Sequence, residues 1–337
     1  MMAILLSCGF RYGIAMVLAL LAIVVGLVLL VWSADRFIEG AAVTARYAGM
    51  PSLVIGMVIV GFGTSAPEMV VSAMAALDGN PALALGNALG SNIVNTGLII
   101  GITALLAPIA VNSNIVKREL PLLLAISLVF GYFLYDRSIS LLESLVLLGG
   151  FFLLVGWTLI TALNSRGDVL ENEVNKELTA HSIPLARAVL WLLVGLVVLL
   201  ISSRMLVWGS VTIAAALGVS NLVIGLTIVA LGTSLPELAA SVMAVRKNEH
   251  DIAIGNVVGS NMFNLLAVVG IAGSIKPMTN IQSEVFTRDW PLMMVLTVAL
   301  FLMAYGFGKQ SKISRWEGTV LLVIFFAYNT YLVATVI

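Results

Sequence analysis

Charged residues are scarce in this sequence: they make up 10% of its 337 residues, whereas a soluble domain carries roughly 25%. Hydrophobic residues make up 61%, and so few charges cannot cover a surface that faces water. Lys and Arg balance Asp and Glu at 17 each, which excludes the basic face that nucleic-acid binding needs. The single cysteine, Cys8, excludes an intramolecular disulfide and a zinc or iron–sulfur site built from cysteines. The composition therefore predicts a protein that crosses the lipid bilayer several times.

Ten apolar stretches are long enough to span the bilayer as helices, which takes about 20 residues each. We predict these spans at 14–33, 52–77, 82–107, 119–135, 141–163, 186–208, 221–246, 252–275, 290–307 and 316–336. The first stretch exceeds the apolar region of a signal peptide, so we expect it to be retained as a helix. The predicted fold is an all-α membrane protein with ten transmembrane helices.

The basic residues are distributed unevenly between the two sides that these spans define. Twelve Lys and Arg residues lie on the side of the polar linker 164–185, and five lie on the side of both termini. Because positive charge favours the cytoplasmic side, we expect a cytoplasmic linker and both termini outside the cell. The predicted location is the cell membrane, which is the inner membrane in a Gram-negative organism. The linker divides the chain into 1–163 and 186–337, each with five spans.

Two segments of the sequence are similar to each other at an offset of 169 residues. Aligned without a gap, residues 56–95 and 225–264 share 18 of 40 identities, including Gly-Thr-Ser-x-Pro-Glu and Gly-Asn-x-x-Gly-Ser-Asn-x-x-Asn. An odd number of spans in each half makes equivalent helices enter the membrane from opposite sides. The sequence thus predicts two inverted-topology five-helix repeats, a plan that many secondary transporters use.

Two glutamates, Glu68 and Glu237, occupy equivalent positions in the repeats and are the only carboxylates deep inside any predicted span. They follow Thr64 and Thr233, which lie near the midpoints of their spans, by four residues. An ionisable group at such a depth costs several kcal/mol and by default indicates a functional site. Ser72 and Thr103, in contrast, are of a type that commonly packs membrane helices together.

A proline precedes each glutamate, at Pro67 and Pro236. Proline lacks an N–H and crowds the carbonyl four residues earlier, so we expect each helix to break there. The carbonyls of residues 61–64 and 230–233 would then need other partners, and a bound cation can serve as one.

The polar groups that these spans offer are all oxygen ligands. They are the two carboxylates, the hydroxyls of Thr64, Ser65, Thr233 and Ser234, the amides of Asn95 and Asn264, and the carbonyls near the breaks. Hard cations such as Ca²⁺ and Na⁺ prefer oxygen. Both histidines, His181 and His250, lie outside the spans, which disfavours a transition metal.

The two repeated motifs closely resemble the α-repeats of the sodium/calcium exchanger family, within the cation/calcium antiporter superfamily. The resemblance is densest at 52–107 and 221–276. It implies a transporter, not an enzyme, that exchanges cytoplasmic Ca²⁺ for external Na⁺ at four central sites without a cofactor, while the first and sixth spans slide over a fixed core. The implied ligands are the side chains of Glu68, Glu237, Thr64, Ser65, Ser91, Asn95, Thr233, Ser234, Ser260 and Asn264, and the carbonyls of Gly61 and Ala230.

Other driving ions and one other class of protein remain open. Some family members carry Asp at the position of Asn264 or at both Asn positions, partly in association with K⁺ transport, so two amides disfavour K⁺ dependence. The family also includes Ca²⁺/H⁺ exchangers. A Ca²⁺-permeable channel could use the same oxygens, but it would pass Ca²⁺ without a Na⁺ gradient.

Overall fold

The computed structural model describes residues 2–47, 61–111, 118–164, 183–246, 250–305 and 312–335, and nearly all of them are helical. Up to residue 164 the elements are α1 (Met2–Tyr47), α3 (Gly61–Thr64), α4 (Ala66–Leu77), α5 (Pro81–Ile93), η2 (Val94–Ile99), α6 (Ile100–Leu106), β1 (Ile109–Ala110), α7 (Leu120–Phe133) and α8 (Leu141–Asn164). From residue 185 they are α10 (Leu185–Leu217), α11 (Asn221–Ile224), η4 (Gly225–Val229), α12 (Ala230–Thr233), α13 (Leu235–Arg246), α14 (His250–Phe263), η5 (Asn264–Val268), α15 (Val269–Ile275), η6 (Val285–Asp289), α16 (Trp290–Tyr305), β2 (Lys312–Ile313) and α17 (Arg315–Ala334).

Each of the ten predicted spans coincides at least in part with a described helix. Seven helices are long and apolar enough to cross a membrane, and the bent pair Asn221–Thr233 and Leu235–Arg246 makes an eighth. The remaining two, α4 and α7, are shorter apolar helices, and residues 51–60 and 112–117 before them lie outside the described ranges. The structure therefore has a multi-pass helical architecture, and the number of ten spans stays a prediction.

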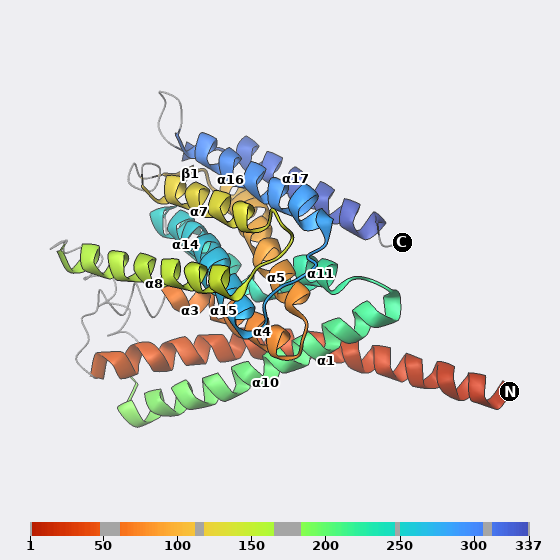
Figure 1. The fold of residues 1–337 in the computed structure, drawn as a ribbon. Coiled ribbons are helices and arrows are strands. Elements are labelled where there is room, and N and C mark those ends of the chain that lie inside the picture. The colour runs from red at the N-terminus through yellow and green to blue at the C-terminus, as the bar shows by residue number, and fades with distance from the viewer. Residues whose placement is uncertain are drawn as a thin grey trace.

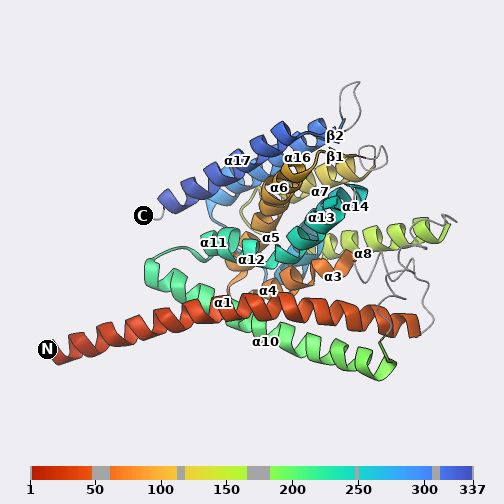
Figure 2. The same cartoon turned by 180° about the vertical axis from the view of Figure 1, so that it is seen from behind.

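The longest helices, α1 and α10, pack side by side along one edge of the bundle and run in opposite directions (Figures 1 and 2). Glycines allow this close approach: a Cβ on Gly40 would lie 2.4 Å from the main-chain N of Leu192. The predicted boundaries of these spans, 14–33 and 186–208, were too short. Each helix continues beyond its apolar stretch, so that Asp35 lies within α1 and Arg204 within α10.

The core of the bundle is formed by the two segments that carry the second repeated motif. In the apolar 18-residue windows of Pro81–Leu106 and Ile252–Ile275, 83% and 72% of the residues are buried, whereas the shares are 28% in the window of Ala15–Thr44 and 22% in that of α10. The helices α16 and α17 lie on the side opposite α1 and α10 (Figure 1). The motif-bearing helices are thus sheltered from lipid by the others.

A short antiparallel sheet departs from the predicted all-α fold. In it β1 pairs with β2, with Ile109 opposite Ile313. Each strand has two residues and joins segments between helices, so no apolar pattern in the sequence could indicate it. It links the end of α6 to the beginning of α17.

Candidate functional site

The two predicted glutamates are buried in the core, and each one meets the other half of the chain. Glu68, in the first turn of α4, and Glu237, in the first turn of α13, are each 1% exposed. Glu68 accepts a hydrogen bond at Oε1 from the Ser234 hydroxyl at 3.2 Å. Glu237 accepts one at Oε1 from the Ser65 hydroxyl at 3.5 Å. The residues of the two motifs therefore interlock around both carboxylates.

Both motif helices break one residue before α4 and α13 begin, close to the predicted positions. Ser65 has φ −85° and ψ 2°, and Ser234 has φ −84° and ψ 7°, so neither continues the helix. The prolines follow in the first turn, where a missing N–H costs least. The breaks turn the Thr-Ser pair toward the facing half.

Of the two predicted carbonyl ligands, the one at Ala230 already has hydrogen-bond donors within the chain. The Ala230 carbonyl already accepts hydrogen bonds from the Ser234 N–H at 3.1 Å and from the Thr233 hydroxyl at 3.3 Å. Gly61 begins α3. A carbonyl has a second lone pair, so the Ala230 oxygen can take a cation only in addition to these donors or in exchange for one.

The remaining predicted ligands come from the central helices. Ser91 of α5, Asn95 of η2, Ser260 of α14 and Asn264 of η5 are all at most 2% exposed. The Ser65 and Ser260 hydroxyls form a hydrogen bond of 3.1 Å, which joins Ser260 to the helix break. We call the predicted side-chain ligands of both motifs the carboxylate, hydroxyl and amide cluster; hydrogen bonds between the motifs join Ser65 to Ser260 and Glu237, and Ser234 to Glu68.

Several oxygens in this cluster have no hydrogen-bond partner. Nine side-chain atoms in the described part of the chain are buried and unpaired, and five of them are oxygens of predicted ligands. They are Oε2 of Glu68, Oε2 of Glu237, Oγ of Ser91, Oδ1 of Asn95 and Oδ1 of Asn264. Leaving a polar atom buried and unpaired costs roughly 1–3 kcal/mol. Buried oxygens without a partner, contributed by both motifs, are the kind of ligand that a desolvated cation requires.

The backbone also changes at the two amide ligands. The π-helical segment η2 starts at Val94, next to Asn95, and η5 starts at Asn264. The two asparagines are equivalent at the offset of 169 residues. Wider π-helical turns inside α-helices occur frequently at functional sites, because they redirect side chains.

Sequence reasoning missed the supporting role of Asn87 and Asn256. Asn87 donates from Nδ2 to the Ser72 hydroxyl at 2.9 Å and to the Glu68 carbonyl at 3.4 Å, and its Oδ1 accepts from Thr233 at 3.1 Å. Asn256 contacts Ser241, Glu237 and Thr64 in the same manner. The repeated Gly-Asn pair was the signal that could have indicated them. Ser72 packs helices together as predicted, but it does so within this network.

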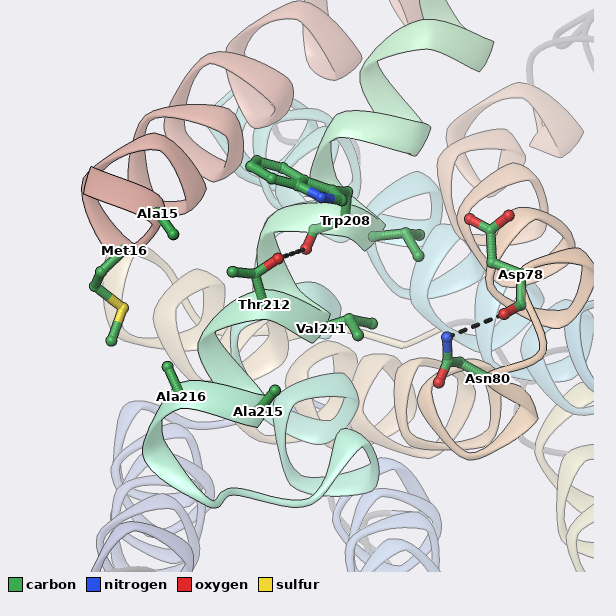
Figure 3. A pocket seen from close by; sticks show the side chains of 10 residues that line it. Ala15, Met16, Asp78, Asn80, Trp208, Val211, Thr212, Ala215 and Ala216 are labelled. Carbon is green, nitrogen blue, oxygen red and sulfur yellow. Dashed lines mark hydrogen bonds between the residues drawn. The ribbon is translucent and has the colours of Figure 1, made fainter. Parts of the chain in front are cut away.

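A pocket that no predicted ligand lines lies between α1, α10 and the turn after α4 (Figure 3). It has a volume of about 580 Å³ and is lined by Ala15, Met16, Asp78, Asn80, Val207, Trp208, Val211, Thr212, Ala215 and Ala216. Asp78 at its edge forms an ion pair of 3.2 Å with Arg204 of α10. Because its walls are mainly apolar and contain no predicted ligand, the pocket is not the cation site.

The charge of the cluster comes from two carboxylates alone. Among the described residues, no group of three or more His, Cys, Asp or Glu side chains could hold a metal ion.

A model of the sodium/calcium exchanger protein family matches residues 18–160 and 187–334, which include both motifs. The chain belongs to the sodium/calcium exchanger family.

Relatives of this exchanger span nearly its whole length. It is 48% identical over 315 residues to CaxA of Alkalimonas amylolytica, a candidate antiporter, covering 93% of this chain and 98% of the relative. It is 40% identical over 301 residues to the inner membrane protein YrbG of Escherichia coli, covering 88% and 91%. The predicted family and the class of antiporters are thereby confirmed.

A solved exchanger has a similar fold. The sodium-calcium exchanger NCX_Mj, in crystals soaked with Na⁺ and Sr²⁺, matches this exchanger with a TM-score of 0.62 and 30% identity, covering 92% of this chain and 97% of that one. The similarity extends over both motif-bearing segments, so the fold is that of an ion exchanger.

Proposed function

We propose that this exchanger moves Ca²⁺ in one direction and Na⁺ in the other, by alternating access to the carboxylate, hydroxyl and amide cluster. The observation that carries the proposal is the set of five unpaired buried oxygens, contributed by both motifs. Ca²⁺ takes 6–8 oxygen ligands, and carboxylates, hydroxyls and amides supply them here. The proposed ligands are the side chains of Thr64, Ser65, Glu68, Ser91, Asn95, Thr233, Ser234, Glu237, Ser260 and Asn264, with the carbonyls of Gly61 and Ala230.

The charge of the site accounts for coupling between the two ions. With both glutamates ionised, the empty site carries two negative charges inside a buried core. One Ca²⁺ neutralises it, and three Na⁺, the usual stoichiometry of the family, leave one positive charge. Since moving two uncompensated carboxylate charges through an apolar barrier is costly, only an occupied site is neutral or compact enough to reorient. Exchange is then obligatory and electrogenic.

Paired contacts support an inverted repeat as the frame for alternating access. Ser65 with Glu237 and Ser234 with Glu68 are equivalent pairs at the offset of 169 residues, and so are Asn87 with Thr233 and Asn256 with Thr64. In this proposal ten spans form two five-helix halves, the linker is cytoplasmic and both termini lie outside. The helices α1 and α10 slide along the core as a unit, because their glycine contacts hold them together.

The ion pair between Arg204 and Asp78 lies where this sliding would occur. It joins α10 to the turn between α4 and α5, beside the pocket of Figure 3. With Arg204 58% and Asp78 31% exposed, the pair contributes about 1 kcal/mol or less. An ion pair of this strength can favour one position of α10 relative to the core without preventing α10 from sliding.

The experiment that tests the proposal is ⁴⁵Ca²⁺ uptake into proteoliposomes under outward Na⁺, K⁺ or H⁺ gradients. We expect uptake with the Na⁺ gradient alone, to a level that rises when a membrane potential compensates the moved charge. Uptake driven only by H⁺, or only when K⁺ accompanies Na⁺, would assign another driving ion. Uptake without any gradient would identify a channel. Glu284→Gln, outside the cluster, serves as the matched control for glutamate substitutions.

A further inference from the structure

Two asparagines beside the cluster contact the amide ligands of the opposite half. Asn92 and Asn261 are equivalent residues of the two Gly-Ser-Asn motifs and are 2% and 1% exposed. Asn92 accepts at Oδ1 from Nδ2 of Asn264 at 3.0 Å. Asn261 accepts at Oδ1 from Nδ2 of Asn95 at 3.1 Å. Neither is among the predicted ligands, and each meets one.

The amide of Asn92 has only one way to face, because its nitrogen lies against a main-chain carbonyl. Its Nδ2 donates to the Asn261 carbonyl oxygen at 3.2 Å and to Sδ of Met293 at 3.4 Å. A carbonyl can only accept, so reversing the amide would set two acceptors against each other. Oδ1 of Asn92 therefore faces Asn264, and Asn264 must present its Nδ2 to it. The Oδ1 atom of Asn264 is left pointing away, and it is one of the five unpaired oxygens.

The second half shows the same arrangement, but its anchor is a hydroxyl, which can donate as well as accept, in place of a carbonyl. Nδ2 of Asn261 donates to the Thr96 hydroxyl at 2.9 Å, and its Oδ1 holds the nitrogen of Asn95. Oδ1 of Asn95 is then unpaired, like that of Asn264. The residue equivalent to Thr96 is Leu265, which cannot accept a hydrogen bond. This difference explains why Asn92 bonds to a backbone carbonyl and a thioether instead.

The orientation of these amides decides how they act on a cation. An asparagine offers an oxygen on one side and an N–H₂ group on the other, and the reversed amide would point positive charge at the ion. We propose that Asn92 and Asn261 are positioning residues that hold the oxygens of Asn264 and Asn95 toward the transported ion. The proposal rests on the function proposed above. It makes each half orient a ligand of the other half.

A double-mutant cycle tests the pairing, with the apparent Ca²⁺ affinity of Na⁺-driven ⁴⁵Ca²⁺ uptake as the readout. Asn92→Ala removes one hydrogen bond to a ligand, so we expect the affinity to weaken about three- to tenfold. Asn264→Ala should weaken it as well. The double variant Asn92→Ala/Asn264→Ala should be no weaker than Asn264→Ala alone, because an absent amide needs no orienting.

Crossed pairs distinguish positioning from a general structural role. Asn92 and Asn95 share no hydrogen bond, so the losses of affinity in Asn92→Ala and Asn95→Ala should multiply in the double variant. Asn261 and Asn95 do share one, so the losses in Asn261→Ala and Asn95→Ala should not multiply. Multiplied effects in every pair would overturn the proposal. An unchanged affinity in Asn264→Ala would instead overturn its assignment as a ligand, and with it part of the proposed function.

A milder variant keeps the test independent of folding. Thr96→Val removes the acceptor that anchors Asn261 and preserves side-chain volume. Its matched control is Thr103→Val, since the Thr103 hydroxyl bonds only to carbonyls of its own helix, at Ile99 and Ile100. We expect Thr96→Val to weaken the Ca²⁺ affinity of the wild type but not to weaken that of Asn95→Ala any further. Thr103→Val should leave the affinity unchanged. Equal behaviour of the two valine variants would count against the proposal.

Discussion

Replacing Glu68 with Gln removes one of the two charges of the cluster with little change of shape. The glutamine keeps an oxygen that can accept from Ser234, as Oε1 of Glu68 does at 3.2 Å. Its nitrogen takes the place of the unpaired Oε2. The substitution therefore tests charge and ligand chemistry while most of the packing around a side chain that is 1% exposed is preserved.

The expected loss follows from electrostatics in a buried site. Two unit charges 4 Å apart interact by about 4 kcal/mol at an effective dielectric constant of about 20, and the interaction with a divalent ion is larger. A loss of about 4 kcal/mol weakens Ca²⁺ binding by about three orders of magnitude. We expect Na⁺-driven ⁴⁵Ca²⁺ uptake at micromolar Ca²⁺ to disappear in Glu68→Gln and in Glu237→Gln.

A stability measurement separates this effect from misfolding. In the absence of Ca²⁺ and Na⁺ the wild type holds a buried carboxylate without a counter-ion, and such a charge costs several kcal/mol. The Tm of Glu68→Gln in detergent should consequently equal or exceed that of the wild type. Uptake by Glu68→Gln within twofold of the Glu284→Gln control would refute the reasoning. So would a lost uptake accompanied by a lowered Tm in both glutamine variants.

Three further predictions concern the ions and the moving helices. Ca²⁺ at a hundred times its Kd should stabilise the wild type by about 2.7 kcal/mol, seen as a rise in Tm that Glu68→Gln does not show; an equal rise would place the ion elsewhere. Arg204→Gln should change the turnover rate of exchange more than the apparent Ca²⁺ affinity, because the ion pair with Asp78 lies outside the ligand cluster; a pure affinity change would contradict this. Gly40→Ala should lower Tm and slow exchange, since its Cβ would meet the Leu192 backbone at 2.4 Å, and an unchanged Tm would show that α1 and α10 can separate freely.

The special position of the two glutamates could be predicted from the sequence because the cost of polarity in a membrane is large. Glu68 and Glu237 appear at equivalent positions of two repeats, and few purposes justify a carboxylate there. Helix breaks near Pro67 and Pro236 follow from the missing N–H of proline, and the structure has them at Ser65 and Ser234. Both the buried glutamates and the helix breaks follow from the chemistry of residues close together in the sequence.

Features that depend on the neighbouring helix were not predictable in the same way. The helices α1 and α10 extend beyond the predicted stretches 14–33 and 186–208, and nothing in the apolar pattern indicates where they end. Nothing in the local sequence indicates the π-helical turns at Asn95 and Asn264, or which atom of Asn92 faces which carbonyl. These are set by packing between segments about 170 residues apart in the chain.

The crossed bonds of Ser65 to Glu237 and Ser234 to Glu68 bear on how such a chain can have arisen. Neither half of the chain supplies the hydroxyl that bonds to its own acid, since each of these hydroxyls belongs to the other half. An ancestral single unit would have had to associate with an oppositely inserted copy of itself before it could carry an ion. Fusion of the two copies into one polypeptide then guarantees that the partners are always present in equal number.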